Sequence, residues 1–339
     1  MGRYKYIPRG TTGGWRKIGD DPLIGGALGT AFDCCVREQE GGYRMWYSWR
    51  PVKGIATTFS KDGKKWNLPQ LVMTRQPELS WAKDEVNRPC VLYREGKYRM
   101  WFIGMNRPLD FTHGYTAAGY AESMDGIHWE IRKEPILVAE EPWEKTSLYC
   151  PHVIWNDDKQ CYQMWYSGGE QFECDSIGYA ESKDGICWEK YKGNPIFSAD
   201  LSHFWEAQKT EACCVIRENG YFYMFYLGIA ADRTTAIGVA RSRDGIRGWE
   251  RHPDNPIIAG TDGNWDYLGI CKPWVMRKDN CYLMWYNGCN QSEWDGQVRE
   301  EIGLAIHEGL ELWPKEGAMP ERQIPEENFV CRSLFLGCK

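Results

Sequence analysis

The sequence predicts an all-β fold, a five-bladed β-propeller with four antiparallel strands in each blade. Three observations support this prediction. One four-strand unit recurs five times along the chain, and no segment shows a sustained helical period. A tryptophan precedes each of the last four units, at Trp81, Trp143, Trp205 and Trp265. The resulting period of roughly 60 residues is typical of a repeat fold, and four-strand units arranged around an axis form a propeller.

The repeat is clearest in its third copy. There Tyr162-Gln163-Met164-Trp165-Tyr166 precedes Ile177-Gly178-Tyr179-Ala180 and then Ser182-Lys183-Asp184-Gly185. Related runs begin at Tyr43, Tyr98, Tyr223 and Tyr282, although the last copy lacks the Asp-Gly turn. Aromatic and β-branched runs separated by turn residues are typical of strands, and Asp-Gly favours a tight turn between the third and fourth of them.

The units assign the whole chain, residues 1–339, to a single propeller domain. In order, the predicted blades cover residues 26–80, 81–142, 143–204, 205–264 and 265–320. We expect the terminal segments to close the ring. The run from Trp15 to Ile24 resembles the end of a fourth strand, and Trp313 is the alternative for that position.

The tryptophans of the repeat fall at two strand positions, which indicates packing between blades. One position holds Trp46, Trp101, Trp165 and Trp285, and the other holds Trp66, Trp129, Trp188 and Trp249.

The overall charge argues against two classes of binding partner. The formal net charge is −6 and no basic cluster is present, so nucleic acid and anionic membranes are not expected partners. No apolar run is long enough to cross a bilayer. The first 17 residues lack the apolar core of a signal peptide, so we expect a cytoplasmic protein.

The 14 cysteines do not show the spacing of a zinc site, because no C-x-x-C pair occurs. Six of them fall on the predicted innermost strands, where we expect reduced and buried thiols. We expect no required cofactor and no catalytic metal, and we leave open a structural metal ion in the central channel. The oligomeric state is not predicted.

The innermost strands line the channel, and their starts differ most between the units. Alignment on Val36, Val91, Val153, Val215 and Val275 brings these starts into register. They carry Asp33, Glu85, Asn87, Arg88, Tyr149, His152, Lys209, Glu211, Lys272 and Trp274. Unpaired charge on a buried strand is unfavourable, so the set predicts either a functional pocket or a ring of ion pairs that plugs the channel. His152 is equally compatible with a ligand and with a core histidine.

The chain resembles the five-bladed propeller glycosidases of glycoside hydrolase families 43 and 32 across all five units. The resemblance implies that Asp33, in Asp33-Cys34-Cys35-Val36, is the general base or nucleophile. It implies that Glu211, in Glu211-Ala212-Cys213-Cys214-Val215, is the general acid. The third carboxylate of those enzymes has no match here, because neither Asn87-Arg88-Pro89 nor Tyr149-Cys150-Pro151 holds an aspartate. Asp84 and Glu85 are the substitutes we consider.

We therefore predict a glycoside hydrolase that acts on a small glycoside or oligosaccharide, because glycoside cleavage needs one protonated carboxyl and one carboxylate. The predicted catalytic residues are Asp33, Glu211, Asp84 and Glu85. The predicted substrate-binding residues are Arg88, Asn87, Tyr149, His152, Lys209, Lys272, Glu144, Asp266 and Trp274.

Other functions remain open on the same scaffold. Arg88, Lys209 and Lys272 could bind phosphate in a glycoside phosphorylase, and a transglycosidase or a biosynthetic lyase or cyclase would also suit a propeller. A non-catalytic carbohydrate-binding propeller is the third possibility, and it predicts that Asp33 and Glu211 do not converge.

The loops between second and third strands are expected to contact sugar. They carry Trp49, Arg50, Asn106, Arg107, His113, Glu170, Gln171, Asp232, Arg233, Asn290, Gln291 and Trp294. The longest loop, from Cys289 to Glu301, is our candidate for a lid or specificity loop.

Overall fold

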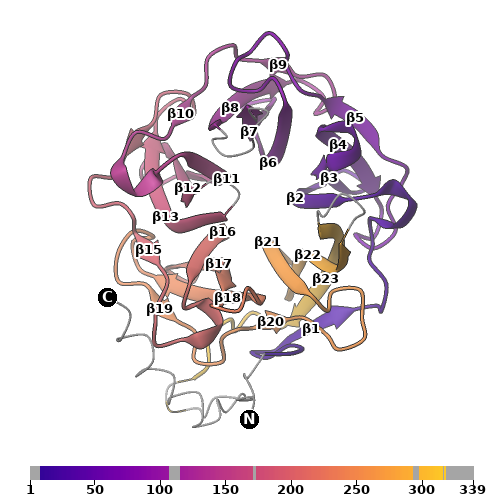
Figure 1. Cartoon of the computed structure of the whole chain (residues 1–339), viewed down its shortest axis with the longest axis vertical. Coiled ribbons are helices and arrows are strands. Elements are labelled where there is room, and N and C mark those ends of the chain that lie inside the picture. The colour runs from indigo at the N-terminus through magenta and orange to yellow at the C-terminus, as the bar shows by residue number, and fades with distance from the viewer. Residues whose placement is uncertain (1–7, 107–114, 171–172, 293–297, 316, 318–339) are drawn as a thin grey trace.

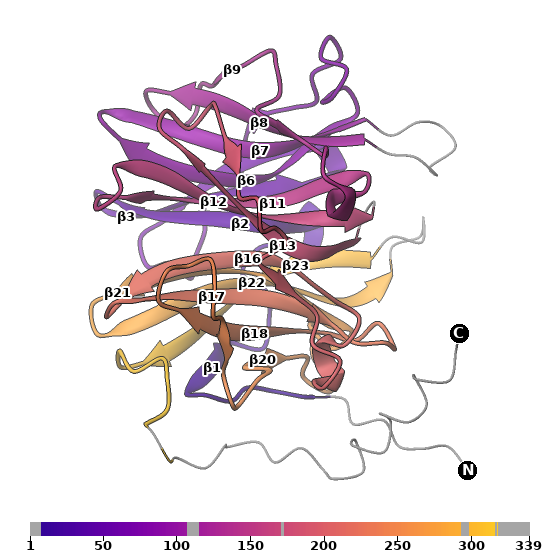
Figure 2. The same ribbon diagram turned by 90° about the vertical axis from the view of Figure 1, so that its left-hand side faces the viewer.

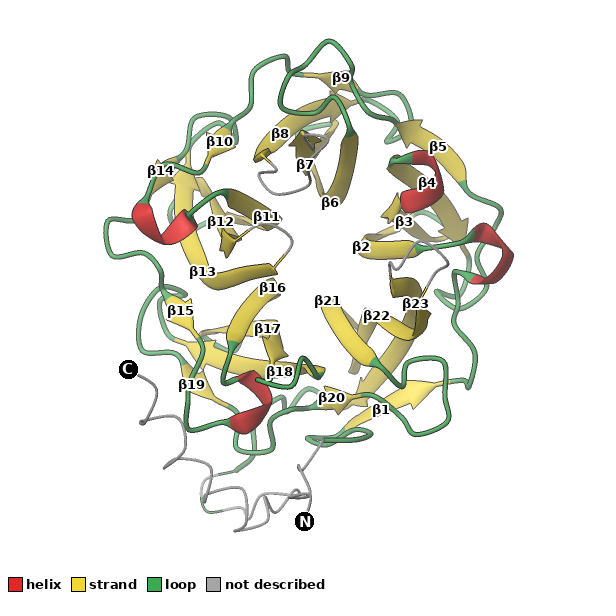
Figure 3. Cartoon of the chain, viewed as in Figure 1, coloured by secondary structure: helices red, strands yellow, loops and turns green. Residues whose placement is uncertain are grey.

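The computed structural model describes residues 8–106, 115–170, 173–292, 298–315 and 317. Five antiparallel sheets surround a central axis (Figure 1). The predicted five-bladed β-propeller is therefore confirmed. Helical structure among the described residues is limited to short 3-10 turns (Figure 3), and no helix there is long and apolar enough to cross a membrane.

The strands follow the repeat in chain order. The first blade contains β2 (Ala31–Gln39), β3 (Gly42–Trp49), β4 (Gly54–Ser60) and β5 (Gln70–Met73). The second contains β6 (Glu85–Arg94), β7 (Lys97–Asn106), β8 (Tyr115–Ser123), β9 (Glu130–Ile131) and β10 (Leu137–Val138). The third contains β11 (Ser147–Asn156), β12 (Cys161–Glu170), β13 (Glu173–Ser182), β14 (Glu189–Lys190) and β15 (Phe197–Ser198).

The fourth blade contains β16 (Lys209–Glu218), β17 (Tyr221–Ile229), β18 (Thr235–Ser242), β19 (Glu250–Arg251) and β20 (Ile258–Ala259). The fifth contains β21 (Gly269–Lys278), β22 (Cys281–Ser292), β23 (Val298–Glu308) and β1 (Trp15–Ile18). The 3-10 turns are η1 (Gly26–Leu28), η2 (Arg50–Val52), η3 (Pro142–Glu144) and η4 (Phe204–Glu206). In the second, third and fourth blades the outermost strand consists of two short pieces that both pair with the third strand.

The N-terminal segment supplies the last strand of the fifth blade. β1 pairs antiparallel with β23, with Trp15 opposite His307 and Ile18 opposite Leu304. It lies beside β20 in both views of the chain (Figures 1 and 2). Trp313 instead packs at the fourth blade, with its ring 5.0 Å from that of His252.

The tryptophans at the first strand position join neighbouring blades, as predicted. Each indole N–H donates to the carbonyl of the Asp-Gly turn in the next blade. The pairs are Trp46–Gly126, Trp101–Gly185, Trp165–Gly245 and Trp285–Gly63. The fifth blade lacks that turn, and the fourth blade has Phe225 at the tryptophan position. Phe225 packs edge-on against Trp15 at 5.7 Å, so an apolar contact replaces the missing acceptor.

A buried ion pair holds β1 in place. Lys17 Nζ lies 2.6 Å from Asp266 Oδ2, and Asp266 is fully buried. The same ammonium donates to the carbonyl of Ala259 in β20. The hydroxyl of Tyr286 donates to Asp266 Oδ2 at 3.2 Å. Ring closure therefore depends on a charge pair as well as on strand pairing.

Replacing Lys17 with alanine should destabilise the propeller by about 3 kcal/mol, because it leaves the buried Asp266 carboxylate without its cation. Arg16→Ala is the matched control on the same strand, since the Arg16 side chain is 64% exposed and lies 3.6 Å from an exposed Glu308. Urea unfolding followed by tryptophan fluorescence measures both. Equal midpoints for the two variants would contradict this role of the pair.

Candidate active site

Every innermost strand bulges at the same point. In each of them the pairing with the second strand skips two residues. The first skipped residue has a positive φ: Asp33 (50°), Arg88 (57°), Cys150 (50°), Ala212 (53°) and Lys272 (45°). A bulge re-aims a side chain out of the strand's regular alternation. The five blades thus present an aspartate, an arginine, a cysteine, an alanine and a lysine at one equivalent position of the channel.

The residues two places further along each innermost strand join that blade to the next one through hydrogen bonds. Cys35, Cys90 and Cys214 accept the backbone N–H of Val91, Val153 and Val275 through sulfur. His152 and Trp274 occupy the same position. His152 Nε2 bonds the carbonyl of Val215 and Trp274 Nε1 donates to that of Val36, both at 2.9 Å.

His152 is held as a core histidine in this ring. Burial lowers its pKa to about 3, so the imidazole is neutral. Its ring lies 5.2 Å from that of Trp274. Within the described ranges, no group of three His, Cys, Asp or Glu side chains is placed to hold a metal ion. A structural metal ion in the central channel stays an open prediction.

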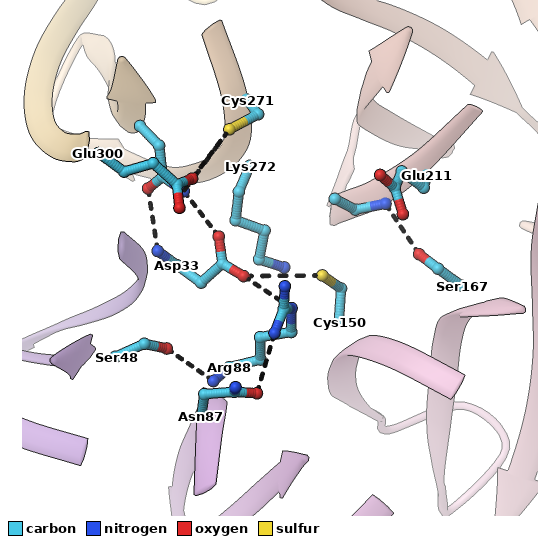
Figure 4. A network of polar contacts seen from close by, with 12 residues as sticks. Asp33, Ser48, Asn87, Arg88, Cys150, Ser167, Glu211, Cys271, Lys272 and Glu300 are labelled. Atoms are coloured by element: carbon cyan, nitrogen blue, oxygen red, sulfur yellow. Dashed lines mark hydrogen bonds and ion pairs between the residues drawn. The ribbon is translucent and has the colours of Figure 1, made fainter. Parts of the chain in front are cut away.

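Asp33 is clamped on both of its oxygens (Figure 4). Asn287 Nδ2 donates to Oδ1 at 2.7 Å, and Asn287 Oδ1 accepts the Asp33 backbone N–H at 2.9 Å. Oδ2 forms an ion pair with Arg88 Nε at 3.0 Å. An amide donor on one oxygen and a guanidinium at the other hold the carboxylate in a fixed orientation. Asp33 is therefore suited to act as a base or as a nucleophile.

Glu211 lies in a different electrostatic environment. Its Oε2 accepts the backbone N–H of Cys174 at 3.0 Å, and the residue is 8% exposed. Burial raises the pKa of its carboxyl to about 7, and the nearby Arg88 cation limits the rise. The negative charge of Asp33, in contrast to Arg88, raises the pKa of Glu211. Near neutral pH a large fraction of Glu211 is therefore protonated and able to donate.

Arg88 acts on both of these carboxyl groups. It pairs with Asp33 and also acts electrostatically on Glu211. Its guanidinium lies 4.4 Å from the ring centre of Tyr149 and donates to Asn87 Oδ1 at 3.0 Å. Three predicted residues from three strands thus contact this cation: Asp33 of β2, Asn87 of β6 and Tyr149 of β11.

Lys272 adds a second cation beside Asp33. The residue is 3% exposed, and its Nζ donates to the carbonyl of Cys213 at 3.3 Å. Burial alone would lower its pKa, but the surrounding groups, Asp33 among them, hold it above the ordinary value. Cys150 Sγ lies 3.9 Å from Asp33 Oδ2. Burial raises the pKa of that thiol to about 12, so it stays protonated.

Lys209, Glu85 and Asp84 lie at the starts of inner strands or just before them. Lys209 pairs with Asp175 at 3.0 Å, near the start of β16. Glu85 accepts from Asn87 Nδ2 at 2.8 Å and is buried at the start of β6. Asp84, next to it, is half-buried. Their predicted roles stay predictions.

Glu144 and Asp266 lie inside blades. Each follows a tryptophan, is fully buried, and accepts from a tyrosine hydroxyl and a lysine on the outer strand. Glu206 in the fourth blade has the same arrangement with Arg251 at 2.6 Å. The described contacts of Glu144 and Asp266 do not join them to the Asp33 cluster.

The structure adds residues that the sequence did not single out as catalytic. Asn287 comes from β22 and Glu300 from β23, within the segment predicted as the lid or specificity loop. Glu300 Oε2 pairs with Arg50 Nη2 at 2.9 Å, and its Oε1 lies 3.4 Å from Asn287 Nδ2. A sequence signal for Asn287 was present. The residue after the Trp-Tyr pair is serine in the first and third units and asparagine in the fifth.

Several predicted loop contacts cannot be placed. Arg107, His113, Gln171 and Trp294 lie outside the described residues, and so do the side chains of Asn290 and Gln291.

Three kinds of known protein resemble this chain: a family, curated relatives and solved structures. A family model described as glycosyl hydrolases family 43 matches residues 29–302. An uncharacterized protein of Mycobacterium tuberculosis is 28% identical over 196 residues, which are 55% of this chain and 60% of that protein. The 1,2-beta-oligomannan phosphorylase of a Thermoanaerobacter species is 26% identical over 221 residues, which are 63% of this chain and 68% of that protein.

A solved thermostable family-43 glycoside hydrolase superposes with a TM-score of 0.66 at 18% identity, covering 88% of this chain and 96% of that one. This likeness supports the fold. The family model covers most of the chain, including both predicted catalytic carboxyl groups. The chain therefore belongs to family 43 of the glycosyl hydrolases.

Proposed function

We propose that this protein is a glycoside hydrolase that cleaves a small glycoside or oligosaccharide at the channel cluster. Glu211 donates a proton to the leaving glycosidic oxygen, and Asp33 activates water or attacks the anomeric carbon. The observation that supports this most strongly is the contrast between the two groups. Asp33 is paired and hydrogen-bonded, whereas burial raises the pKa of Glu211 to about 7. Two carboxyl groups in such different environments can divide the acid and base roles.

The other residues of the cluster suit this reaction without a cofactor. Arg88 forms an ion pair with Asp33, and the ring of Tyr149 packs against the guanidinium. Arg50 and Lys272 supply donors that can bind sugar hydroxyls. We propose that the substrate is a carbohydrate whose scissile bond lies between Asp33 and Glu211.

A glycoside phosphorylase is the second candidate. The specific observation in its favour is the pair of cations at bulge positions, Arg88 and Lys272, both beside Asp33. Guanidinium and ammonium groups are the usual protein partners of phosphate. The similarity to the oligomannan phosphorylase agrees with this alternative.

One screen tests both candidates. Aryl glycosides and short oligosaccharides are incubated with the wild-type protein, with and without inorganic phosphate, and the products are identified by NMR. Hydrolysis predicts a free reducing sugar at a rate that phosphate does not change. A sugar phosphate that forms only with phosphate would redirect the assignment to a phosphorylase. No turnover of any sugar would contradict both.

We also propose a cytoplasmic location. All 12 cysteines that the structure describes are free thiols. Thiols in such number persist in a reducing compartment.

A further inference from the structure

One contact beside Asp33 differs from the equivalent contacts made by the first and third blades. In the first and third blades the residue after the Trp-Tyr pair of the second strand is Ser48 or Ser167. Each hydroxyl accepts only the bulge N–H of the next blade among its described contacts. In the fifth blade the equivalent residue is Asn287. A hydroxyl donates and accepts through one oxygen, whereas an amide accepts through its oxygen and donates through a separate NH₂ group. Asn287 therefore bonds both the backbone N–H and the carboxylate of Asp33.

Glu300 fixes the orientation of that amide. Asn287 Nδ2 lies 2.7 Å from Asp33 Oδ1 and 3.4 Å from Glu300 Oε1, so the NH₂ group faces two carboxylates. If the amide rotated by half a turn, its oxygen would face both of them, and the Asp33 N–H would lose its acceptor. The contacts of Glu300 therefore favour the one orientation in which Asn287 donates to Asp33.

Glu300 is itself held from two further directions. Arg50 Nη2 pairs with Oε2 at 2.9 Å, and Cys271 Sγ lies 3.5 Å from Oε1. Arg50 in turn packs over the ring of Phe32, the residue before Asp33, at 4.7 Å. The turn η2 and strand β21 thus support one carboxylate of β23, whose contact with Asp33 runs through Asn287 of β22.

We propose that Glu300, acting through Asn287, is a positioning residue that aims the Asp33 carboxylate at the reacting carbon. This inference rests on the proposed function, in which Asp33 acts on the substrate. It assigns a role to Glu300, near the end of the segment that the sequence predicts as a lid or specificity loop.

Three variants separate this role from a purely structural one. Asn287→Ser restores the residue of the first and third blades, so it keeps an acceptor for the bulge N–H and removes the amide NH₂ group that donates to the carboxylate. We expect kcat to fall about 10- to 100-fold with KM changed less than about threefold, since a misplacement of about 1 Å can reduce the rate about 100-fold. Glu300→Ala should behave alike, and Glu300→Gln, which retains an acceptor for Asn287, should recover much of the loss.

The control is Glu308→Gln on the same strand, whose side chain is 72% exposed. It should leave kcat and KM unchanged. Crystal structures of Asn287→Ser and Glu300→Ala give a readout that does not need a known substrate. In both, the Asp33 carboxylate should rotate from its wild-type orientation.

Two results would overturn the proposal. One is a kcat within twofold of wild type for both Asn287→Ser and Glu300→Ala while Asp33→Asn is inactive, which leaves the proposed function standing. The other is an unmoved Asp33 carboxylate in both crystal structures. A fully active Asp33→Asn variant is a different result, because it rejects the proposed function itself.

Discussion

Replacing Asp33 with asparagine is expected to reduce kcat by at least about 1,000-fold, the range seen when an essential acid–base group is lost. The substitution removes the charge and keeps the size of the side chain. It also suits the backbone, because Asp33 has a φ of 50° and asparagine tolerates the left-handed region better than most residues. The loss should therefore be chemical, with the fold preserved.

Asp279→Asn provides the matched control. Asp279 also has a positive φ, of 52°, and its side chain is 84% exposed in a turn. Steady-state kinetics on an aryl glycoside, with circular dichroism to verify folding, compares the two. An Asp33→Asn variant that keeps more than half of the wild-type kcat would exclude Asp33 from the chemistry.

Replacing Glu211 with glutamine is expected to have an effect that depends on the leaving group. A substrate with a poor leaving group, such as a methyl glycoside, needs protonation and should lose about 1,000-fold in kcat/KM. A dinitrophenyl glycoside, whose leaving group departs unprotonated, should lose only about 10-fold by the same reasoning. Equal losses on both substrates would contradict the role of Glu211 as the acid.

The pH profile gives a second signature of Glu211. A general acid must be protonated, so kcat/KM of the wild type should fall as pH rises through about 7. Glu206 also has a pKa raised by burial to about 7, but it lies inside the fourth blade beside Arg251. The fall of kcat/KM with rising pH should therefore disappear in Glu211→Gln and persist in Glu206→Gln.

Stability provides an independent check on the same pKa. Because the folded-state pKa of Glu211 is raised, folding favours its protonated form, and this contribution is lost as pH rises through about 7. Glu211→Gln removes the ionisation. It should melt at a higher temperature than wild type at pH 8, and the difference should shrink towards pH 5.

The blades could be predicted because each depends on local pattern. Short aromatic strands, an Asp-Gly turn and a fixed period determine a blade, and the alignment on the five valines brought Asp33, Arg88 and Lys272 to one level. The bulge itself was not predicted. It depends on how the first strand registers with the second, which the alternation of side chains does not reveal.

Glu300, Glu144 and Asp266 show the limit of that alignment. Glu300 follows the fifth unit's second strand, where the repeat motif breaks off and there was no other copy for comparison. Glu144 and Asp266 were grouped with the channel because they precede innermost strands. The structure shows them bonded to tyrosine and lysine within their own blades. Strand order locates a residue along the chain, but the direction of its side chain depends on tertiary packing.

The central claim is that Asp33 and Glu211 form one catalytic unit, and a double-variant cycle on one aryl glycoside tests it most directly. We would measure kcat/KM for wild type, Asp33→Asn, Glu211→Gln and the double variant. Groups that act as a unit have strongly non-additive effects. We predict that the double variant is no more than about 10-fold slower than the slower single variant. Losses that simply multiply, or a single variant as active as wild type, would contradict the claim.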